Sequence, residues 1–522
     1  MFWVDIVTKE SKIKGPVLVN DAKTPSGKIH VGSLRGVMIH DFVYKSFLRS
    51  GEKANYTYHF DDFDPMDSLP TYLRKEKYEK YMGAPLKDIP APKGEESYAE
   101  FYAKDFIKIF NSLGAKPKII WAFKDLYKTG KLDEAIRIGL DAASKIQEIY
   151  HKVSGSQKKK DWYPFQPVCE KCGKIGTTRV FAWDGKLVSY KCEPDIVEWA
   201  VGCSHEGKVS PFGGSGKMPY KVEWPAKWFS LGINFEGAGK DHTSKGGTRD
   251  VANHIMREVF KKDPPEDLPY EFFIYGGRKM SSSEGIGASA FEVAQILPPN
   301  LLRFLMARFH PKVAIDFDPT RPDATPNLFD EYDRAREAYF KNPDSDLGRT
   351  FEAGHIGKPA RVFVPRFSTL ANWIRLPGIS VEEETEKTKG AKLTWEDKVA
   401  LEKRSHYVRI WLENFAPDDM KPFKFSDKKE TGLNQWELDL IRELASKLKK
   451  GLDKDKTLAW YVFNFVTRYN KFKKQPSGKP ISSKEAFQTL YRVLIGQEQG
   501  PRLDALVTSH YDRVTKILSR YE

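Results

Sequence analysis

A strand, a helix and a second strand can be read one after another near the start of the chain, and this opening constrains the fold more than any other feature of the sequence. The apolar patterns predict a buried strand at 16–20, a helix at 33–50 and an alternating strand at 55–60. Such a βαβ opening predicts a parallel sheet with a ligand crevice at the carboxyl ends of its strands. The turn at 20–33 and the acidic turn at 61–64 should therefore face one crevice.

The whole chain, at 522 residues, is too long for one hydrophobic core, so we expect about two to four units around separate cores. Residues 97–100 have the form of a capping box and predict the start of a further helix. The segment 157–216, rich in lysine, cysteine and glycine, is interpreted as inserted, and the sheet pattern resumes at 228–235. Beyond about residue 350 the pattern is mostly helical and charged, and the acidic run at 382–386 predicts a solvated loop.

The charge balance of the chain favours a polyanionic partner. Lys and Arg number 85 against 71 Asp and Glu, a formal net charge of +14, so nucleic acid is the first candidate. A basic, well-solvated protein without such a partner is the alternative. No stretch approaches the roughly 18 to 20 apolar residues that cross a bilayer, and the first six residues have no signal-peptide pattern. We therefore expect a cytoplasmic protein that does not span a membrane.

Two short segments have residues suited to nucleotide chemistry. The first is PSGKIHVGS at 25–33, where small residues let a ligand approach the backbone and His30 stands at the start of a helix, a favourable place for phosphate. The second is GGRKMSSS at 276–283, a Gly-rich loop with Lys279 and three hydroxyl groups, which suit the leaving group of a triphosphate. Alone, each segment could equally be an ordinary turn.

In this order, the two segments resemble the HIGH and KMSKS signatures of class I aminoacyl-tRNA synthetases. Two positions depart from the signatures: Ser33 stands at the second histidine of HIGH and Ser282 at the second lysine of KMSKS. The class I lysyl-tRNA synthetases resemble the chain in these same departures. They also resemble it in further segments along nearly the whole chain: WPAKW at 224–228, GAGKDH at 237–242 and GQEQGPRL at 496–503.

The resemblance implies an α/β fold, with a Rossmann-like parallel-sheet catalytic domain, an inserted zinc-binding module and an all-α anticodon-binding region. The implied limits are 1–125 for the first half of the catalytic domain, 126–218 for the inserted module with its zinc knuckle, 219–275 for the second half, 276–350 for the KMSKS loop and stem-contact region, and 351–522 for the anticodon-binding domain.

The resemblance also implies an activity: a monomer that activates L-lysine with ATP to lysyl-adenylate and transfers it to the 3′ end of tRNA(Lys), using Mg²⁺ and a structural Zn²⁺. His30 and Lys279 would be catalytic. The implied ATP-binding residues are Pro25, Ser26, Gly27, His30, Gly32, Ser33, Gly237, Gly239, Asp241, Lys279, Met280, Ser281, Ser282 and Ser283.

The lysine pocket carried over from the family consists of Ala22, Thr24, Tyr220, His242 and Tyr270. The family has Gly where this chain has Ala22 and Trp where it has Tyr220, but tyrosine keeps an aromatic face that attracts an ammonium group.

A lysine substrate also needs an anion, because a buried charge needs a partner. The candidates are Asp62, which we prefer, and Asp64, both on the acidic turn. The alternative is that these carboxylates cap the turn or face water.

The cysteines favour a metal site over disulfides, because all four fall within residues 169–203. The candidate ligands are Cys169, Cys172, Cys192, Cys203 and His205. Zinc takes four nitrogen or sulfur ligands, so either the four cysteines or three of them with the histidine would hold it. Four free thiols in a core are the alternative, which the polar residues around the first pair disfavour. The zinc would stabilise the inserted module.

Two rival functions remain. A glutamyl-like or cysteinyl-like synthetase would share the fold and the inserted module, but a glutamate pocket needs a basic anchor and the turn at 61–64 is acidic. A non-catalytic tRNA-binding paralogue is disfavoured by the presence of His30 and Lys279. In the helical region, Lys471, Lys473 and Lys474 are candidates for contact with RNA phosphate, and most of the neighbouring aromatic residues are expected to be core.

Overall fold

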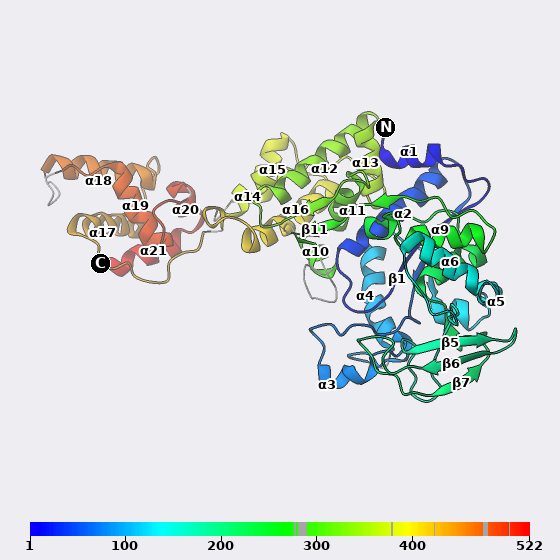
Figure 1. Ribbon diagram of the computed structural model, residues 1–522. Helices are drawn as coiled ribbons and strands as arrows, with labels where there is room; N and C mark the ends of the chain where they lie inside the picture. Colours follow the sequence, from blue (N-terminus) through cyan, green and yellow to red (C-terminus); the bar gives the residue numbers. More distant parts are fainter. Residues whose placement is uncertain are drawn as a thin grey trace. The chain divides into compact units, whose positions relative to one another are not determined.

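The structure is a computed structural model that describes residues 1–94, 96–275, 278–279, 290–376, 379–421, 423–472, 479–500 and 502–522. The chain divides into two compact units, whose helices and strands are labelled in Figure 1. Unit 1 comprises residues 1–318 and 331–359, and unit 2 comprises residues 319–330 and 360–522. The finer domain limits expected from the sequence stay a prediction.

The predicted βαβ opening is confirmed in unit 1. Strand β1 (Val17–Lys23), helix α2 (Gly32–Arg49) and strand β2 (Ala54–Phe60) follow in order, and β3 (Lys118–Trp121) completes a parallel sheet of order β1-β2-β3. The register places Lys23 opposite Phe60, and Phe60 opposite Trp121. All three strands thus end at one edge, the edge at which open sheets bind ligands.

The expected strand at 228–235 is wrong for most of its length. Residues Tyr220–Leu231 form helix α7, which ends at Gly232 in a left-handed conformation with φ of +68°. Trp224 and Trp228 lie four positions apart, the spacing that places both rings on one helix face. Only Phe235 pairs with the sheet, through single parallel bridges to Val19 and Glu266. The apolar run was therefore the buried face of a helix.

The acidic run at 382–386 is also helical, contrary to the predicted loop. It lies in α15 (Val381–Lys389), where the Ser380 side chain accepts a hydrogen bond from the amide of Glu383. Carboxylates in the first turn of a helix are stabilised by its dipole, so the acidic run favours a helix start.

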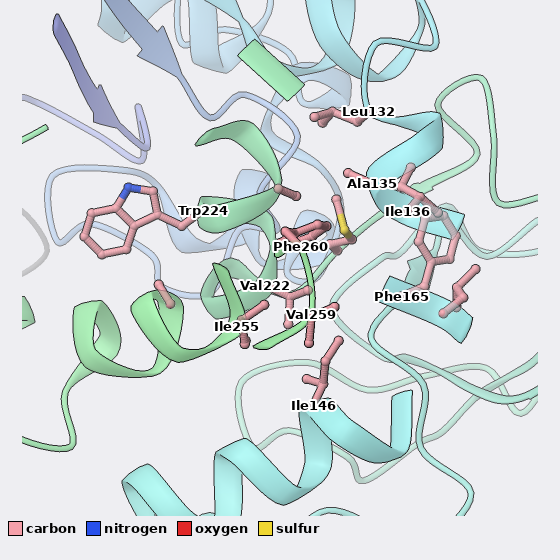
Figure 2. Close-up of a cluster of buried hydrophobic side chains, with 14 of the residues drawn as sticks. Leu132, Ala135, Ile136, Ile146, Phe165, Val222, Trp224, Ile255, Val259 and Phe260 are labelled. Carbon is pink, nitrogen blue, oxygen red and sulfur yellow. The ribbon is translucent and has the colours of Figure 1, made fainter. Parts of the chain in front are cut away.

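The inserted segment shares its core with the catalytic part. Helices α5 (Asp133–Asp141) and α6 (Ala143–Ser154) precede it, and α7 and α9 (Thr248–Glu258) follow it. Figure 2 shows Ile136, Ile146, Val222 and Ile255, one from each helix, in a single buried cluster. The insertion itself contains an antiparallel sheet and the short pair β4 (Gln166–Pro167) and β8 (Gly216–Lys217). The sheet has three strands: β5 (Thr178–Trp183), β6 (Val188–Cys192) and β7 (Glu206–Val209).

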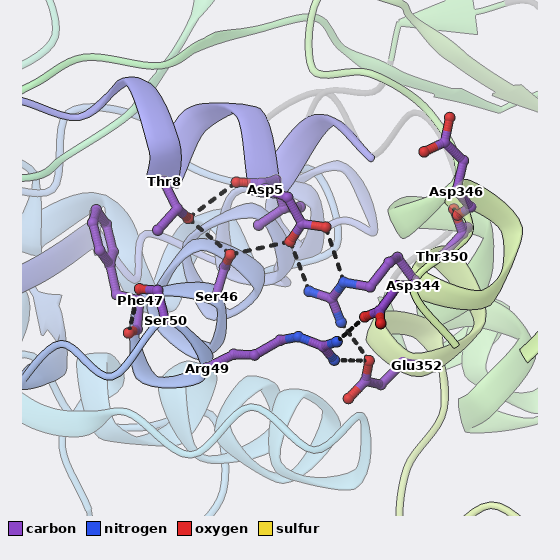
Figure 3. Close-up of polar contacts among 12 residues, drawn as sticks. Asp5, Thr8, Ser46, Phe47, Arg49, Ser50, Asp344, Asp346, Thr350 and Glu352 are labelled. Carbon is purple, nitrogen blue, oxygen red and sulfur yellow. Dashed lines mark hydrogen bonds and ion pairs between the residues drawn. The ribbon is translucent and has the colours of Figure 1, made fainter. Parts of the chain in front are cut away.

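The N-terminal helix α1 (Trp3–Glu10) is held to α13 (Asp346–Gly354) by ion pairs (Figure 3). The Arg349 guanidinium donates from Nε and Nη2 to the two oxygens of Asp5, at 2.9 and 2.7 Å. Arg49 at the end of α2 pairs with Asp344 and Glu352. Residues 295 to 344 positions apart therefore form one polar cluster in unit 1.

The remaining elements frame this core. In chain order they are α3 (Lys75–Tyr78), α4 (Tyr98–Ser112), β9 (Ala238–Gly239), α8 (Lys240–Thr243), β10 (Pro269–Tyr270), β11 (Phe273–Tyr275), β12 (Arg278–Lys279), α10 (Ala290–Ile296), α11 (Pro299–Ala307), β13 (Ile315–Phe317) and α12 (Ala324–Lys341).

The described part of unit 2 beyond residue 360 is helical, without a strand. Its further helices are α14 (Phe367–Ile374), α16 (Trp395–Asn414), α17 (Gln435–Lys450), α18 (Leu458–Phe472), α19 (Ser483–Ile495), α20 (Leu503–Ser509) and α21 (Tyr511–Leu518). Among the described residues, no helix combines the length and apolarity needed to cross a membrane.

Candidate active site

A cavity of about 540 Å³ lies at the carboxyl ends of β1 and β2, where the sequence predicted a crevice. It is lined by residues from six segments: Asn20, Asp21, Ala22, Lys23, Thr24, Ser26, His30, Gly32, Ser33, Tyr58, Asp61, Asp64, Asp67, Tyr220, Trp224, Lys227, Glu236, Gly237, Ala238, Gly239, Asp241, His242, Tyr270 and Phe272.

The cavity brings together most of the residues that the family resemblance singled out. Of the expected lysine-binding set, Ala22, Thr24, Asp64, Tyr220, His242 and Tyr270 line it. Of the expected ATP-binding set, Ser26, His30, Gly32, Ser33, Gly237, Gly239 and Asp241 line it. Pro25, Gly27 and Asp62 are not among the lining residues.

The expected KMSKS loop falls largely outside the described residues. The backbone of Lys279 pairs with Ile274 in the antiparallel β11–β12 contact, but the loop residues Met280, Ser281, Ser282 and Ser283 lie outside the described ranges. Their roles stay predictions.

Aromatic rings form one wall of the cavity. The rings of Tyr220 and Trp224 stack with centroids 5.5 Å apart, and His242 meets both edge-on at 6.2 and 6.0 Å. Glu236 fixes the wall, since its carboxylate accepts hydrogen bonds from the indole nitrogens of Trp224 at 3.0 Å and Trp228 at 2.6 Å. The wall offers π faces, which attract cations.

A buried ion network forms and underlies the floor of the cavity, and its members Asp61, Asp64 and Lys227 line the cavity directly. Lys217 pairs with Asp64 and, at 2.9 Å, with Glu223, whereas Lys227 pairs with Asp61 and lies 3.7 Å from Glu223. Burial disfavours the ammonium of Lys217, but the carboxylates of Asp64 and Glu223 outweigh it and raise the pKa of Lys217. Three carboxylates thus surround two cations, and the floor favours a positively charged ligand.

Asp21, which the sequence reasoning missed, adds another carboxyl group. Its Oδ1 accepts a hydrogen bond from the amide of Ala22 at 2.9 Å, and its Oδ2 lies 3.6 Å from Nδ1 of the buried His40. Burial raises the pKa of Asp21 to about 7. An aspartate in the second half of a strand that begins with three apolar residues was the available signal.

Asp62 is held elsewhere. Its Oδ1 accepts a hydrogen bond from the amide of Phe123 at 2.9 Å, in the π-helical turn η3 (Ala122–Tyr127). Asp64 instead lies in the cavity wall, where its Oδ2 accepts a hydrogen bond from the Thr24 hydroxyl at 2.5 Å. Of the two candidate anions, the structure therefore places Asp64 in the cavity lining and Asp62 outside it, and the role of either toward lysine stays a prediction.

The four cysteines form a cluster that could hold a metal ion. Their Sγ atoms all lie within 4.8 Å of one another, with 3.6 Å between Cys169 and Cys203 and 3.7 Å between Cys172 and Cys192. A zinc ion with tetrahedral Zn–S bonds of about 2.3 Å separates its sulfurs by about 3.8 Å. The geometry therefore fits zinc. His205 is not part of the cluster, and its Nε2 lies 3.7 Å from Glu170 instead.

Comparison with known proteins gives matches along nearly the whole chain. The family profile described as tRNA synthetases class I (K) matches residues 3–356. A lysine–tRNA ligase of Thermoplasma acidophilum is 32% identical over 507 residues, and one of Thermoplasma volcanium is 34% identical over 508 residues. Each alignment covers 96% of this chain and 95% of the relative.

Among solved structures, a glutamate tRNA ligase from Elizabethkingia meningosepticum aligns with a TM-score of 0.45 and 11% identity. That alignment covers 97% of this chain and 99% of the other chain. At this score the likeness supports no conclusion about the chain.

The matches, together with a cavity at the carboxyl edge of a parallel sheet, define a class I aminoacyl-tRNA synthetase. Within that class, the chain belongs to the family of tRNA synthetases class I (K).

Proposed function

We propose that the protein is a lysine–tRNA ligase, which activates L-lysine with ATP to lysyl-adenylate and transfers the lysyl group to the 3′ end of tRNA(Lys). The observation that supports it most is the chemistry of the cavity, where an aromatic wall stands over a floor richer in carboxylates than in cations. The lysine–tRNA ligase relatives add independent support.

The lysine substrate has two ammonium groups, and the cavity offers partners for both. The rings of Tyr220 and Trp224 provide cation–π attraction of roughly 0.5 to 2 kcal/mol, and Asp64 and Asp21 provide carboxyl groups. A glutamate side chain beside Asp64 would meet carboxyl groups instead of a free basic anchor, because Lys217 and Lys227 are already paired there. The cavity therefore favours lysine over glutamate.

The ATP side of the cavity is the start of α2 and the segment 237–241. His30 and Ser33 flank the first turn of α2, where amide groups and the helix dipole favour phosphate. A side chain on Gly237 would approach the carbonyl oxygen of Leu268 to 2.7 Å, so glycine lets this cavity-lining segment pack closely against the backbone at 268. The loop lysine, Lys279, is proposed to contact the leaving pyrophosphate.

Catalysis would need no enzyme nucleophile. A carboxylate oxygen of lysine attacks the α-phosphorus of ATP, the bond from that phosphorus to the bridging oxygen of the β-phosphate breaks, and pyrophosphate leaves. The Mg²⁺ that accompanies ATP would neutralise phosphate charge. The residues of the cavity position the two reactants in line and stabilise the developing charge.

We further propose that the four-cysteine cluster holds a structural Zn²⁺ and that unit 2 binds the tRNA. The zinc proposal is supported by the sulfur spacing. The RNA proposal is supported by the formal charge of +14 and by the names of the relatives.

Isotope exchange between pyrophosphate and ATP, measured over lysine, glutamate, cysteine and arginine, tests the proposed function. We expect exchange with lysine alone, followed by charging of tRNA(Lys). Exchange with glutamate or cysteine would show that the protein is a synthetase for that amino acid. A lack of exchange with every amino acid would favour a non-catalytic tRNA-binding paralogue.

A further inference from the structure

The cavity is lined by two lysines, Lys23 and Lys227, and the surroundings of Lys23 differ from those of Lys227 and of the neighbouring Lys217. Lys23 is the last residue of β1 and directly precedes the turn that leads to His30. Its carbonyl accepts a hydrogen bond from the amide of Asp61, and its side chain lines the cavity. Lys23 therefore stands at the carboxyl edge of the sheet, where open sheets bind ligands.

The ammonium of Lys23 has no direct ion pair or hydrogen bond among the described residues. Lys217 and Lys227, by contrast, both pair directly with carboxylates. Burial lowers the pKa of Lys23, and the charges of Asp21 and Asp241 offset this only in part. A half-buried cation without a contact partner among the described residues loses part of its hydration, so a ligand anion is the natural partner.

Two replacements in the signature segments give a reason for a cation at the position of Lys23. In this chain the second imidazole of the first signature is replaced by Ser33, and the second lysine of the other by Ser282. Two cationic positions for the phosphates are thus missing. Lys23 lines the same cavity as His30 and Ser33, so its charge can act on the same ligand groups.

We propose that Lys23 is a catalytic residue that contacts the α-phosphate of ATP during adenylate formation. Negative charge builds on the non-bridging oxygens while the lysine carboxylate attacks the α-phosphorus and pyrophosphate leaves. In its protonated form Lys23 stabilises that charge, compensating in part for the cations that Ser33 and Ser282 replace. The inference rests on the proposed activation of lysine.

Replacement of Lys23 by methionine tests the proposal, since methionine preserves the apolar length of the side chain. We expect Lys23→Met to reduce kcat for ATP–pyrophosphate exchange about 100-fold or more, as removal of one charge-stabilising donor does. Binding of lysine without ATP should change less than about threefold, because the contact forms on phosphate. Lys23→Arg, which keeps the charge, should recover part of the rate.

Lys245→Met is the matched control. Lys245 is exposed and not among the cavity-lining residues, so its loss removes one charge from the same unit without changing the exchange rate. Thermal unfolding of each variant verifies that it is folded.

An unchanged kcat in Lys23→Met would overturn the proposal. So would a weaker affinity for lysine with an unchanged affinity for lysinol, which lacks the carboxylate, because Lys23 would then contact the amino acid. Exchange is measured with whichever amino acid the unaltered enzyme activates. If the proposed substrate is wrong, the unaltered enzyme will show exchange with an amino acid other than lysine. If the proposed role of Lys23 is wrong, only the comparison between the variants and the unaltered enzyme will show it.

Discussion

Asp61, Asp62 and Asp64 show how one short turn distributes three carboxyl groups to different surroundings. Asp61 and Asp64 pair with lysines from other elements, whereas Asp62 accepts a hydrogen bond from a backbone amide. Burial raises the pKa of Asp62 to about 7, while ion pairing with Lys217 outweighs burial and lowers the pKa of Asp64. The pKa values of two aspartates in one turn are thus shifted in opposite directions.

The raised pKa of Asp62 predicts a pH-dependent stability. The folded protein binds a proton at Asp62 more tightly than the unfolded chain does, so unfolding free energy falls as pH rises from about 4 to 7. A pKa raised from 3.8 to about 7 corresponds to at most about 4 kcal/mol. Asp62→Asn keeps the acceptor for the Phe123 amide without the charge. It should match the parent near pH 4 and be more stable at pH 8, as denaturant unfolding at both pH values would reveal.

The same variant tests the position of Asp62 relative to the substrate. Since Asp62 does not line the cavity, Asp62→Asn should leave lysine affinity unchanged, whereas Asp64→Asn should weaken it. A loss of lysine affinity in Asp62→Asn would show that Asp62 is the carboxylate that pairs with the lysine substrate.

Helix α18 illustrates how a single element can combine a core face with a binding face. Its exposed side carries Trp460, Phe463, Asn464, Thr467, Arg468 and Lys471, which recur at helical spacing. Trp460 and Phe463 are 41% and 50% exposed. The sequence from 457 to 484 contains no acidic residue. Exposed aromatic rings beside cations suit unpaired RNA nucleotides.

The exposed rings of α18 are therefore predicted to contact tRNA. The double variant Trp460→Ala/Phe463→Ala should raise the Kd for tRNA about 10- to 100-fold, because stacking contributes roughly 1 to 3 kcal/mol per base. Binding of lysine, measured in the absence of tRNA, should be unchanged. Filter binding at fixed salt gives the Kd.

Trp395→Ala provides the comparison, since Trp395 in α16 is 74% exposed but lies outside this aromatic and basic stretch. Equal loss of tRNA affinity in both proteins would show that the effect is not specific to α18.

At the scale of the whole molecule, the cysteine cluster and the cavity are connected within unit 1 by a strand pair and by backbone hydrogen bonds. Strand β4 leads directly to the cluster at Cys169, and its partner β8 contains Lys217, which pairs with Asp64 in the cavity floor. The loop of the first two cysteines also bonds to the body, because the amides of Ile175 and Gly176 donate to the carbonyl of Gly83. A metal in the cluster should therefore stabilise the cavity as well as the insertion.

Removal of the metal is predicted to affect both stability and substrate binding. Chelation should lower the Tm and weaken lysine affinity, because a loosened insertion no longer holds Lys217 against Asp64. Calorimetry and metal analysis before and after addition of Zn²⁺ would measure both effects. Cys172→Ser should respond little to the chelator, and an unchanged Tm in metal-free protein would refute a structural metal.

The sequence by itself determined the local features of this protein. Period-two and helical patterns gave the βαβ opening, and the capping box at Ser97 is present as predicted, with both of its hydrogen bonds. The spacing of the cysteines indicated a single cluster before any geometry was known. Each of these features depends on residues close together in the chain, so periodicity and turn chemistry are enough to find them.

Only the tertiary structure determines which polar side chains contact one another. Asp64 faces the cavity because Lys217, 153 positions later, pairs with it, and no local pattern contains that contact. The same holds for the exclusion of His205 from the cysteine cluster and for the ammonium of Lys23, which has no direct partner in the described part of the chain. A buried charge takes the orientation that its partners allow. Those partners come from distant segments that only the folded chain brings together.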